Sequence, residues 1–371
     1  MKKEINSILH YNREDLIDKV HLNEAQKLSA FDQVLRSKWD EAVENGCFWY
    51  QLDKLETKVL SGKFKFVAQL NVKRAQERRK PQHITSVTMP FDNSLFNFTK
   101  VKDAEILFRI KNIEEETSSQ AGHYVIINVS PLEYCNALLV PYLEDCLPQV
   151  TTSGFCSNKS ASLQPEYSTF QVLTRQGLLL AIDTVLLSGS PAFRLGFNSL
   201  CGFASVNHHH YHMYYLEHRL YLETASVSHL YGNCYEIVDY PAEGFAFQAT
   251  SKNRSTIVNE ILKVVQVFVD DSVAHNIFIT RGSEFGENNV KDVERYSVVR
   301  IYVWARRSSY GAKDEAAFNV ALCELSGHLP MKSDEGFQTV TEESAAADLR
   351  SFCHDTFVPV RNKLLQKYST R

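Results

Sequence analysis

The sequence predicts an α+β fold made of two copies of one unit. The chain has 371 residues, more than a usual single domain, which favours two units or one duplicated unit. An apolar helix followed by two extended segments occurs once in each half. We therefore expect an N-terminal unit at residues 1–222 and a C-terminal unit at residues 223–371.

The elements before the first repeat are one helix and several strands. Apolar residues recur three and four positions apart from Asn23 to Asn45, which predicts an amphipathic helix that Gly46 ends. Strands are expected at Phe64–Val72, Glu105–Ile110, His123–Val129 and Ala137–Pro141, with turns at Glu114–Gln120 and Ser130–Asn136. The last two strands should form a hairpin.

The repeated part consists of a helix and a hairpin. In the first copy a polar loop around Ser153 precedes a helix at Tyr167–Leu187, which Gly189 closes, and Phe193–Phe197 pairs with the stretch from Gly202. In the second copy Phe245–Ala249 is a short strand, Thr256–Phe268 a helix, and Ala274–Thr280 pairs with Ser297–Trp304. A terminal helix is expected at Ser344–Tyr368.

The stretch Asn198–Leu216 carries the clearest chemical signal. From Gly202 onward its residues are mostly apolar, β-branched or aromatic and include no proline, which predicts a strand entered by a turn at Asn198–Gly202. Side chains two positions apart share one face of a strand, so His208, His210 and His212 should point one way and His209 the other.

Three interpretations of this histidine row stay open from the residues alone. Neutral imidazoles on a strand can bind zinc and leave one position for water. Alternatively, the middle imidazole attacks phosphorus while its neighbours hold its tautomer and meet phosphate oxygens. The third interpretation is a polar sheet surface with hydrogen-bonded histidines.

Composition excludes several classes of function. A net charge of −4 and a pI near 6.4 give no general attraction to nucleic acid or to anionic membranes. Eight cysteines without a Cys-X-X-Cys pair suggest neither a zinc ribbon nor a disulfide framework, and fit a reducing cytoplasm. The first 15 residues lack the apolar core of a secretory signal, and no apolar run approaches the ~20 residues that span a bilayer.

The most basic stretch is Lys73–Pro81, with Lys73, Arg74, Arg78, Arg79 and Lys80. Its interpretations, in order of preference, are a solvated loop, a phosphate or nucleotide contact, and an RNA or nuclear-import patch. The last is least favoured because Glu77 interrupts the charge and no aromatic residue lies within the stretch.

The histidine row resembles the signature of the histidine triad superfamily of nucleotide hydrolases and transferases. Longer stretches are similar to the GDP-D-glucose phosphorylase family, which is related to plant GDP-L-galactose phosphorylase. They are Gly196–Ser199, Ala204–Leu216, Phe66–Val72, Arg78–Gln82, Phe96–Lys100, Ile127–Tyr134, Leu138–Pro141 and Phe318–Pro330. The resemblance implies a duplicated histidine-triad-like unit with antiparallel sheets and packed helices.

The resemblance also implies a nucleotidyltransferase. Such an enzyme transfers GMP from GDP-D-glucose to inorganic phosphate, gives glucose 1-phosphate and GDP, and uses no catalytic metal or other cofactor. The nucleophile's place falls on His210, and a GMP-histidine intermediate follows. An imidazole with a pKa near ~6.5 is largely neutral at cytosolic pH. Its other nitrogen should donate to a backbone carbonyl near His208, while His208 and His212 orient it or meet phosphate oxygens.

Other positions are weaker candidates. Asn198 and Ser199 are candidate phosphate or ribose contacts, although turn chemistry alone explains both. His328 belongs to a stretch that looks like a family motif, Ser326–Pro330. The chain departs from the family pattern at Cys135-Asn136, where Gly-His is usual, and at His209, where leucine is usual. We expect His209 to pack, hydrogen-bonded, on the face opposite to the row.

Two alternative functions remain. A histidine triad hydrolase would use water where the phosphorylase uses phosphate, and a metal-dependent or noncatalytic nucleotide-binding protein would need no covalent step. In the second copy Arg300–Trp304 takes the place of the histidine strand and carries no histidine, so one catalytic row is expected. The resemblance implies guanine, and a buried carboxylate or carbonyl elsewhere must read that base, because the row itself offers nothing to do so.

Overall fold

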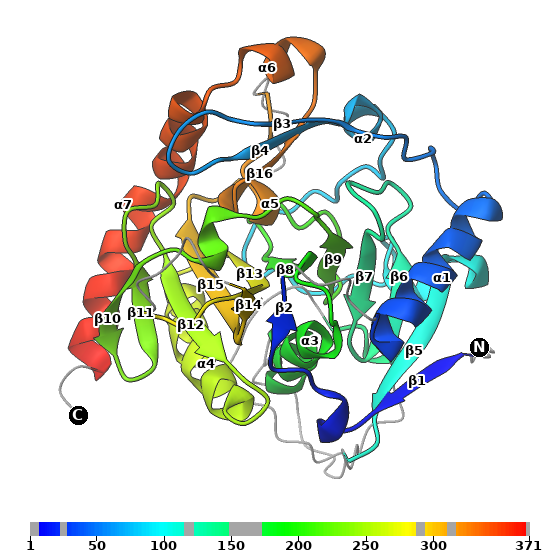
Figure 1. The fold of residues 1–371 in the computed structure, drawn as a ribbon, viewed down its shortest axis with the longest axis horizontal. Coiled ribbons are helices and arrows are strands. Elements are labelled where there is room, and N and C mark those ends of the chain that lie inside the picture. The colour runs from blue at the N-terminus through cyan, green and yellow to red at the C-terminus, as the bar shows by residue number, and fades with distance from the viewer. Residues whose placement is uncertain are drawn as a thin grey trace.

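The computed structural model describes residues 7–22, 28–114, 122–147, 173–286, 294–309 and 317–368. One long sheet of 11 strands runs through the molecule, and helices cover it (Figure 1). Its strands in spatial order are β1 (Ile8–Tyr11), β5 (Ile106–Asn112), β6 (His123–Ile127), β7 (Ala137–Val140), β9 (Tyr211–Tyr215), β8 (Phe193–Asn198), β13 (Ala274–Gly282), β15 (Val298–Arg306), β12 (Phe245–Ala249), β11 (Cys234–Ile237) and β10 (Val227–Tyr231). The predicted α+β class is confirmed.

The centre of this sheet is the antiparallel pair β8–β13, in which Gly196 lies opposite Phe278. From this pair outward, each half of the sheet continues as a hairpin partner and three further strands: β9, β7, β6 and β5 on one side, and β15, β12, β11 and β10 on the other. All these neighbours are antiparallel, and β1 joins β5 in parallel. Two related units would give this order; their boundary at residues 222 and 223 stays a prediction.

A row of four helices packs on one face of the sheet. They are α1 (Ala30–Glu44), α3 (Arg175–Leu187), α4 (Arg254–Asp270) and the C-terminal half of α7 (Glu342–Tyr368). Tyr211, Met213 and Tyr215 of β9 are buried in this core. Alternate residues of a strand face opposite ways, so His212 and Tyr214 face away from these helices.

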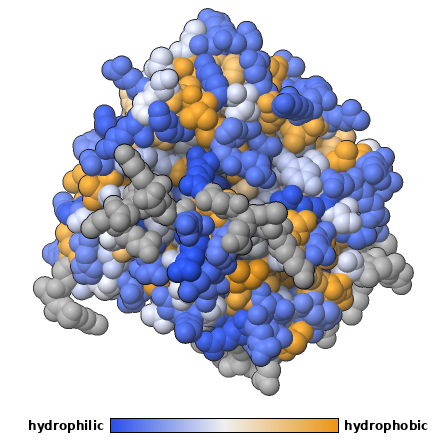
Figure 2. All heavy atoms as spheres, in the orientation of Figure 1, coloured by the Kyte–Doolittle hydropathy of each residue, from blue (hydrophilic) through white to orange (hydrophobic). Residues whose placement is uncertain are grey.

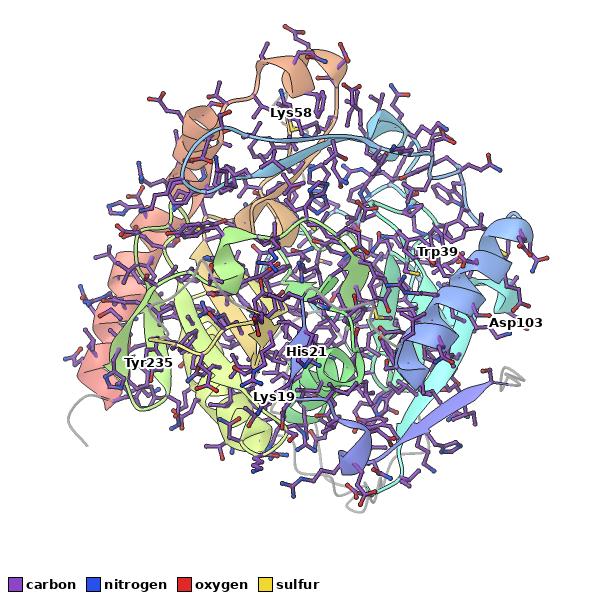
Figure 3. The ribbon with its side chains drawn as sticks, in the orientation of Figure 1. Lys19, His21, Trp39, Lys58, Asp103 and Tyr235 are labelled. Carbon is purple, nitrogen blue, oxygen red and sulfur yellow. The ribbon has the colours of Figure 1, made fainter. Side chains whose placement is uncertain are left out.

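The opposite face carries a small sheet and short helices. The small sheet joins β3 (Glu56–Val59), β4 (Val67–Leu70) and β16 (His328–Met331), and Lys58 marks it at the top of Figure 3. The helices α2 (Val72–Gln76), α5 (Leu322–Leu325) and α6 (Asp334–Thr339) flank it, and a further two-stranded sheet joins β2 (Val20–His21) and β14 (Arg295–Tyr296). A second apolar core lies between this layer and the long sheet.

Short 3-10 helices complete the described structure. They are η1 (Arg13–Asp15), η2 (Phe98–Lys100), η3 (Asp103–Glu105), η4 (Leu143–Asp145) and η5 (Tyr221–Glu223). No helix in the described ranges combines the length and the apolarity that a bilayer crossing requires. Hydrophilic and hydrophobic side chains are interspersed over the face of the molecule in Figure 2.

Three predicted elements begin or end elsewhere. Helix α1 starts at Ala30 because Ser29 caps it with Asp32, and the predicted residues 23–27 lie outside the described ranges. Helix α3 starts at Arg175 because the Thr174 hydroxyl accepts from the Gly177 N–H. The predicted residues 167–172, the loop around Ser153 and most of the turn at 114–120 are also outside the described ranges. The strand predicted at Phe64–Val72 is confined to β4, and Asn71 caps α2 directly after it.

Candidate active site

The histidine segment differs from the predicted strand. Pairing with neighbouring strands begins at Tyr211, and residues 202–210 form an irregular connection. Its polar groups bond to loops instead: Gln82 donates its N–H to the Ser205 carbonyl, and Asn207 donates its amide to the carbonyls of Met89 and Pro90. The His209 N–H donates to the Leu147 carbonyl at 2.7 Å. These bonds replace the ladder that a strand would need.

His210 lies at the end of this segment, directly before β9. Its Nδ1 donates to the His208 carbonyl at 2.7 Å, which confirms the predicted hydrogen bond. This bond places the proton on Nδ1, so Nε2 carries the lone pair. Burial lowers the pKa of His210 to about 4, against the opposing effect of the His208 carbonyl. The ring is therefore neutral near pH 7, the form in which an imidazole nitrogen has a free lone pair.

The two flanking histidines have different environments. The His212 ring lies 5.1 Å from that of His210, and its Nδ1 has no hydrogen-bond partner among the described residues. Burial, with His210 and Arg74 nearby, holds the pKa of His212 well below its usual value. His208 instead accepts the Phe98 N–H on Nδ1 at 3.1 Å, and burial lowers its pKa to about 3. His208 therefore bonds to the Phe98 backbone and does not line the cavity that His210 and His212 line, unlike the common face predicted for the row.

His209 points to the helix side of the sheet, as predicted. Its ring packs against Phe197 and Tyr211, and a Cβ at Gly177 of α3 would lie 2.7 Å from its Cε1. Neither ring nitrogen bonds to a residue that the structure describes, so the expected hydrogen bond is wrong. Burial lowers the pKa of His209 to about 3, and it packs here as a neutral ring.

A cavity of about 530 Å³ opens on the side of β9 that faces the small sheet. His210 and His212 both line it. Apolar side chains form one part of its wall: Phe98, Val101, Ile126, Leu138 and Val206. Polar and cationic side chains line the remainder, among them Asn71, Arg74, Arg78, Asn128, Ser130, Asn198, Ser205, Asn319 and Lys332. Its volume is that of a pocket for a small molecule or nucleotide.

Arginines from the basic stretch belong to this cavity. Arg74 and Arg78 line it, and the Arg74 guanidinium donates to the Ser130 carbonyl. Arg79 also lines it and stacks over the Phe96 ring at 3.6 Å. Arg78 is exposed, in keeping with the preferred interpretation as a solvated loop, whereas Arg74 and Arg79 are partly buried in the cavity wall. A phosphate or nucleotide contact was the second interpretation, and their positions favour it.

Lys332 and Glu324 are cavity residues that the sequence did not indicate. Lys332 follows β16, two positions beyond the family-like stretch Ser326–Pro330. Glu324 lies on α5 and accepts the Ala321 N–H at 3.0 Å. Burial raises the pKa of Glu324 to about 7, although Arg74 and Lys332 favour its charged form. A carboxylate that titrates near neutrality inside a cavity is a candidate functional group.

Asn198 lines the cavity, whereas Ser199 and His328 lie behind its wall. Asn198 Oδ1 accepts from the Leu322 N–H and from Asn276. Ser199 accepts the His275 N–H at 2.8 Å and donates to the Leu200 carbonyl. Both ring nitrogens of buried His328 contact polar side chains, Gln69 and Tyr214. The substrate contacts predicted for Asn198, Ser199 and His328 stay predictions.

The position where the family usually has Gly-His is structural in this chain. Buried Asn136 accepts the Leu132 N–H on Oδ1 and donates to the Met213 carbonyl from Nδ2. Cys135 before it has a positive φ of 55° and is buried beneath the turn. Asn136 therefore fastens the β6–β7 turn to β9 without facing the cavity.

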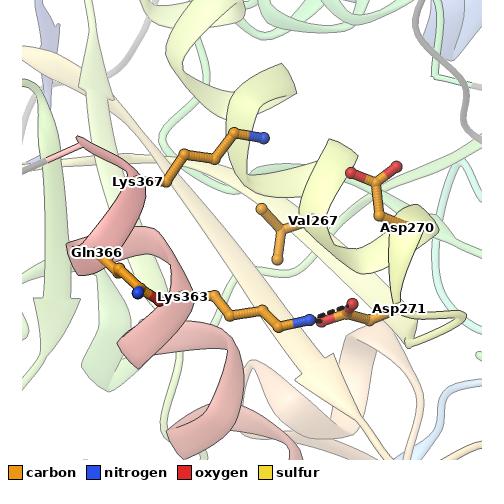
Figure 4. A pocket seen from close by; sticks show the side chains of 6 residues that line it. All are labelled: Val267, Asp270, Asp271, Lys363, Gln366 and Lys367. Atoms are coloured by element: carbon orange, nitrogen blue, oxygen red, sulfur yellow. Dashed lines mark hydrogen bonds and ion pairs between the residues drawn. The ribbon is translucent and has the colours of Figure 1, made fainter.

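A second depression lies between the ends of α4 and α7 (Figure 4). Its wall consists of Val267, Asp270, Asp271, Lys363, Gln366 and Lys367. Lys363 forms an ion pair with Asp271 across it. Its lining residues include no histidine, whereas His210 and His212 line the cavity beside β9, which is therefore the candidate active site.

Comparisons with known proteins agree with this arrangement. The model of the GDPGP1-like N-terminal domain matches residues 30–158 and 163–214, and that of the C-terminal domain matches residues 222–369. GDP-D-glucose phosphorylase 1 of Danio rerio is 44% identical over 91% of this chain and 91% of its own length. The Homo sapiens protein of that name is 42% identical, over 86% and 78%. GDP-L-galactose phosphorylase 2 of Arabidopsis thaliana is 28% identical, over 90% and 75%.

The fold is also shared with a solved structure. The complex of yeast Ap4A phosphorylase Apa2 with Ap4A superposes with a TM-score of 0.55 at 12% identity, over 88% of this chain and 97% of that one. The two domain models together match most of the chain, in the order in which its two halves build the sheet. With its histidine segment beside a cationic cavity, the chain belongs to the GDPGP1-like family.

Proposed function

We propose that this chain is a GDP-hexose phosphorylase that transfers GMP from GDP-D-glucose to inorganic phosphate, giving glucose 1-phosphate and GDP. The observation that carries the proposal is His210, a buried neutral imidazole with its proton fixed on Nδ1, in the wall of a cavity that also holds Arg74 and Lys332. Relatives at 42–44% identity are named GDP-D-glucose phosphorylase 1.

In the first step the Nε2 lone pair of His210 attacks the α-phosphorus. A nitrogen–phosphorus bond forms, the bond from that phosphorus to the bridging oxygen breaks, and glucose 1-phosphate leaves with the electron pair. The imidazole becomes cationic in the GMP-histidine intermediate. Its Nδ1–H stays on the His208 carbonyl at 2.7 Å, and that oxygen dipole stabilises the developing charge.

In the second step an oxygen of inorganic phosphate attacks the same phosphorus. The nitrogen–phosphorus bond breaks, His210 recovers its lone pair, and GDP is the product. Both steps crowd negative oxygens near His210. Arg74, Arg78 and Lys332 compensate this charge from the cavity wall, and His212 and Asn198 orient the phosphoryl oxygens.

The apolar part of the wall suits the nucleoside. The Phe98 ring lies 4.9 Å from the His210 ring, so a nucleoside whose α-phosphate is at His210 reaches Phe98, Val101, Ile126 and Leu138. Guanosine then lies along these side chains, and the hexose lies at the cationic end. We place the reaction in the cytoplasm; the seven described cysteines are all unbridged thiols, which suits a reducing compartment.

The experiment that tests the proposal is incubation with GDP-glucose, with and without phosphate, followed by chromatography. A phosphorylase gives GDP and glucose 1-phosphate in amounts that depend on phosphate. A histidine triad hydrolase gives GMP whether or not phosphate is present. A noncatalytic nucleotide-binding protein leaves GDP-glucose intact, which would overturn the proposal.

A further inference from the structure

We propose that Glu105 reads the base: its carboxylate accepts hydrogen bonds from N1–H and the 2-amino group of guanine held at the apolar end of the cavity. This inference rests on the proposed function, since it takes the α-phosphate to lie at His210. It deepens that function by assigning base selectivity to a residue outside the histidine row.

A series of contacts leads from His210 to Glu105 through the rings of Phe98 and Phe96 and the guanidinium of Arg79. Phe98 belongs to η2 and Glu105 ends η3, so two consecutive turns of the chain carry them. Arg79 connects them from the other side: its Nη2 lies 3.8 Å from Glu105, and its guanidinium stacks on Phe96, whose ring lies 6.0 Å from that of Phe98. Glu105, Arg79 and Phe98 all line the cavity.

Among the described residues two carboxylates line this cavity, those of Glu105 and Glu324, and they lie in different surroundings. Glu324 is close enough to Arg74 and Lys332 for both to affect its pKa, and Arg74 also influences His212. That end therefore suits phosphate groups and the hexose. Glu105 lies instead beside Arg79, whose guanidinium stacks on the Phe96 ring, and we place the purine ring at this aromatic part of the wall.

The Glu105 carboxylate keeps capacity for a ligand. It is 9% exposed. Among the described residues its polar contacts are long: the Lys102 N–H donates to Oε1 at 3.3 Å, and Arg79 lies 3.8 Å from Oε2, beyond hydrogen-bond distance. An ionised carboxylate accepts about four hydrogen bonds, so both oxygens can take a further donor.

Guanine offers two adjacent donors to such a group, N1–H and the 2-amino group. Two parallel N–H to oxygen bonds to one carboxylate are charge-assisted and directional. Adenine presents an unprotonated N1 and no 2-amino group at that edge. Bound adenine would leave the Glu105 oxygens facing a lone pair, and a buried acceptor without a donor is costly. The carboxylate therefore selects guanine by penalising adenine.

The test compares kcat/KM for GDP-glucose, IDP-glucose and ADP-glucose in wild type and Glu105→Gln. Hypoxanthine in IDP-glucose keeps N1–H and lacks the 2-amino group. We expect wild type to prefer GDP-glucose over ADP-glucose by roughly a hundredfold. Glu105→Gln should lose about ten- to a hundredfold on GDP-glucose, change little on ADP-glucose, and make the GDP and IDP sugars nearly equal.

Two control variants isolate the position. Asp103→Asn removes one charge from the same short helix, but Asp103 is exposed at the edge of the molecule (Figure 3) and should leave the base preference unchanged. Glu324→Gln removes the other cavity carboxylate and should lower activity equally for all three bases. A GDP to ADP preference that stays at the wild-type value in Glu105→Gln would overturn the inference.

Calorimetric binding of GDP, IDP and ADP to the same variants gives the second readout, which needs no turnover and works also if the proposed reaction is wrong. Wild type should bind GDP more tightly than ADP, and Glu105→Gln should not discriminate between them. If Glu105→Gln fails to fold, Glu105→Asp takes its place; its shorter side chain should reduce the preference while keeping the charge. Wild type that turns over no nucleotide sugar, yet binds GDP selectively through Glu105, would reject the phosphorylase and retain this inference.

Discussion

β9 and β15 occupy equivalent places on either side of the central β8–β13 pair. They differ in their polar side chains: β15 carries buried arginines, and β9 with the residue before it carries histidines. On β15, Arg300 is buried, and its guanidinium donates to the carbonyls of Ser283, Leu222 and Ala225. Arg306 likewise donates to the Val320 carbonyl and the Ser309 hydroxyl. Beside β9, His210 and His212 face a cavity instead.

This difference separates structural from chemical polar groups. The guanidinium groups of the β15 arginines donate hydrogen bonds to protein oxygens, and these bonds hold loops against the sheet. The imidazoles of His210 and His212 are neutral because burial lowers their pKa, and the Nδ1 of His212 lacks a partner among the described residues. Of two equivalent strands in one sheet, β15 therefore stabilises the fold, and β9 positions the candidate reactive histidines.

The largest expected effect is the loss of turnover in His210→Ala or His210→Asn. Both variants remove the nucleophile, so the covalent route is disabled and kcat should fall by about four orders of magnitude or more. Both variants should still fold, because loss of the hydrogen bond to the His208 carbonyl costs only about 1–3 kcal/mol, and thermal unfolding measures this cost. Wild type quenched after GDP-glucose without phosphate should carry an acid-labile GMP on His210, detected by mass spectrometry. Near-normal turnover in either variant would end the assignment.

The opposite result is expected on β15. Arg300→Met leaves the buried carbonyls of Ser283 and Ala225 without this donor, each costing about 1–3 kcal/mol, whereas the Leu222 carbonyl keeps the Tyr302 hydroxyl. The free energy of unfolding in urea should therefore fall by at least about 2 kcal/mol. The folded fraction should keep its kcat, since Arg300 does not line the cavity. A variant with unchanged unfolding and lost turnover would show that β15 takes part in the reaction.

The sequence predicted the larger features because they have periodic local signals. The hairpins β8–β9 and β13–β15, the helix α4 and the position of His210 before β9 all follow from runs of apolar residues and from the histidine row. The bond from His210 Nδ1 to the His208 carbonyl followed from the chemistry that a nucleophile needs.

The remaining features depend on contacts between distant parts of the chain. Residues 202–210 have the composition of a strand, but loops from residues 82–98 take up their hydrogen-bonding groups. Arg74 and Glu324 stand 250 positions apart, and only the parallel pairing of β4 with β16 brings their elements together. No local pattern could show that the three arginines of the basic stretch line the cavity that holds His210.

A smaller effect is expected for the neighbours of His210. His208→Ala keeps the carbonyl that fixes the His210 tautomer and loses the contact with Phe98, and His212→Ala loses one cavity-lining ring. Each should lower kcat by about ten- to a hundredfold, because they position or neutralise charge without forming the bond to phosphorus. Steady-state kinetics of the three variants, before and after EDTA treatment and dialysis, provide the measurement. Equal losses in all three, together with zinc whose removal abolishes activity, would favour the metal interpretation.

The smallest expected effect is that of pH on formation of the intermediate. His210 attacks in its neutral form, and burial lowers its pKa to about 4. The neutral fraction should therefore hardly change between pH 7 and pH 5, whereas the neutral fraction of an imidazole with a pKa of about 6.5 would fall about twenty-fivefold. Single-turnover adduct formation from GDP-glucose without phosphate measures this step and avoids the titration of phosphate itself.

The buried histidines and Glu324 change the stability of the protein with pH in opposite directions. The free energy of unfolding must therefore be measured alongside adduct formation. Histidines with a depressed pKa take up protons more readily when unfolded, so they reduce stability as pH falls from about 6.5 toward 4. Glu324 acts in the other sense: its pKa is raised from 4.5 to about 7, so its contribution is full below pH 4.5 and is lost as pH rises through 7. Urea unfolding of wild type and Glu324→Gln at pH 5 and pH 8 separates the two.

A different result would contradict the buried, neutral state of His210. If adduct formation in the folded fraction drops about tenfold or more from pH 7 to pH 5, the His210 ring is accessible to water in solution. The contrast between a buried reaction site beside β9 and the fully hydrogen-bonded arginines of β15 would then not hold.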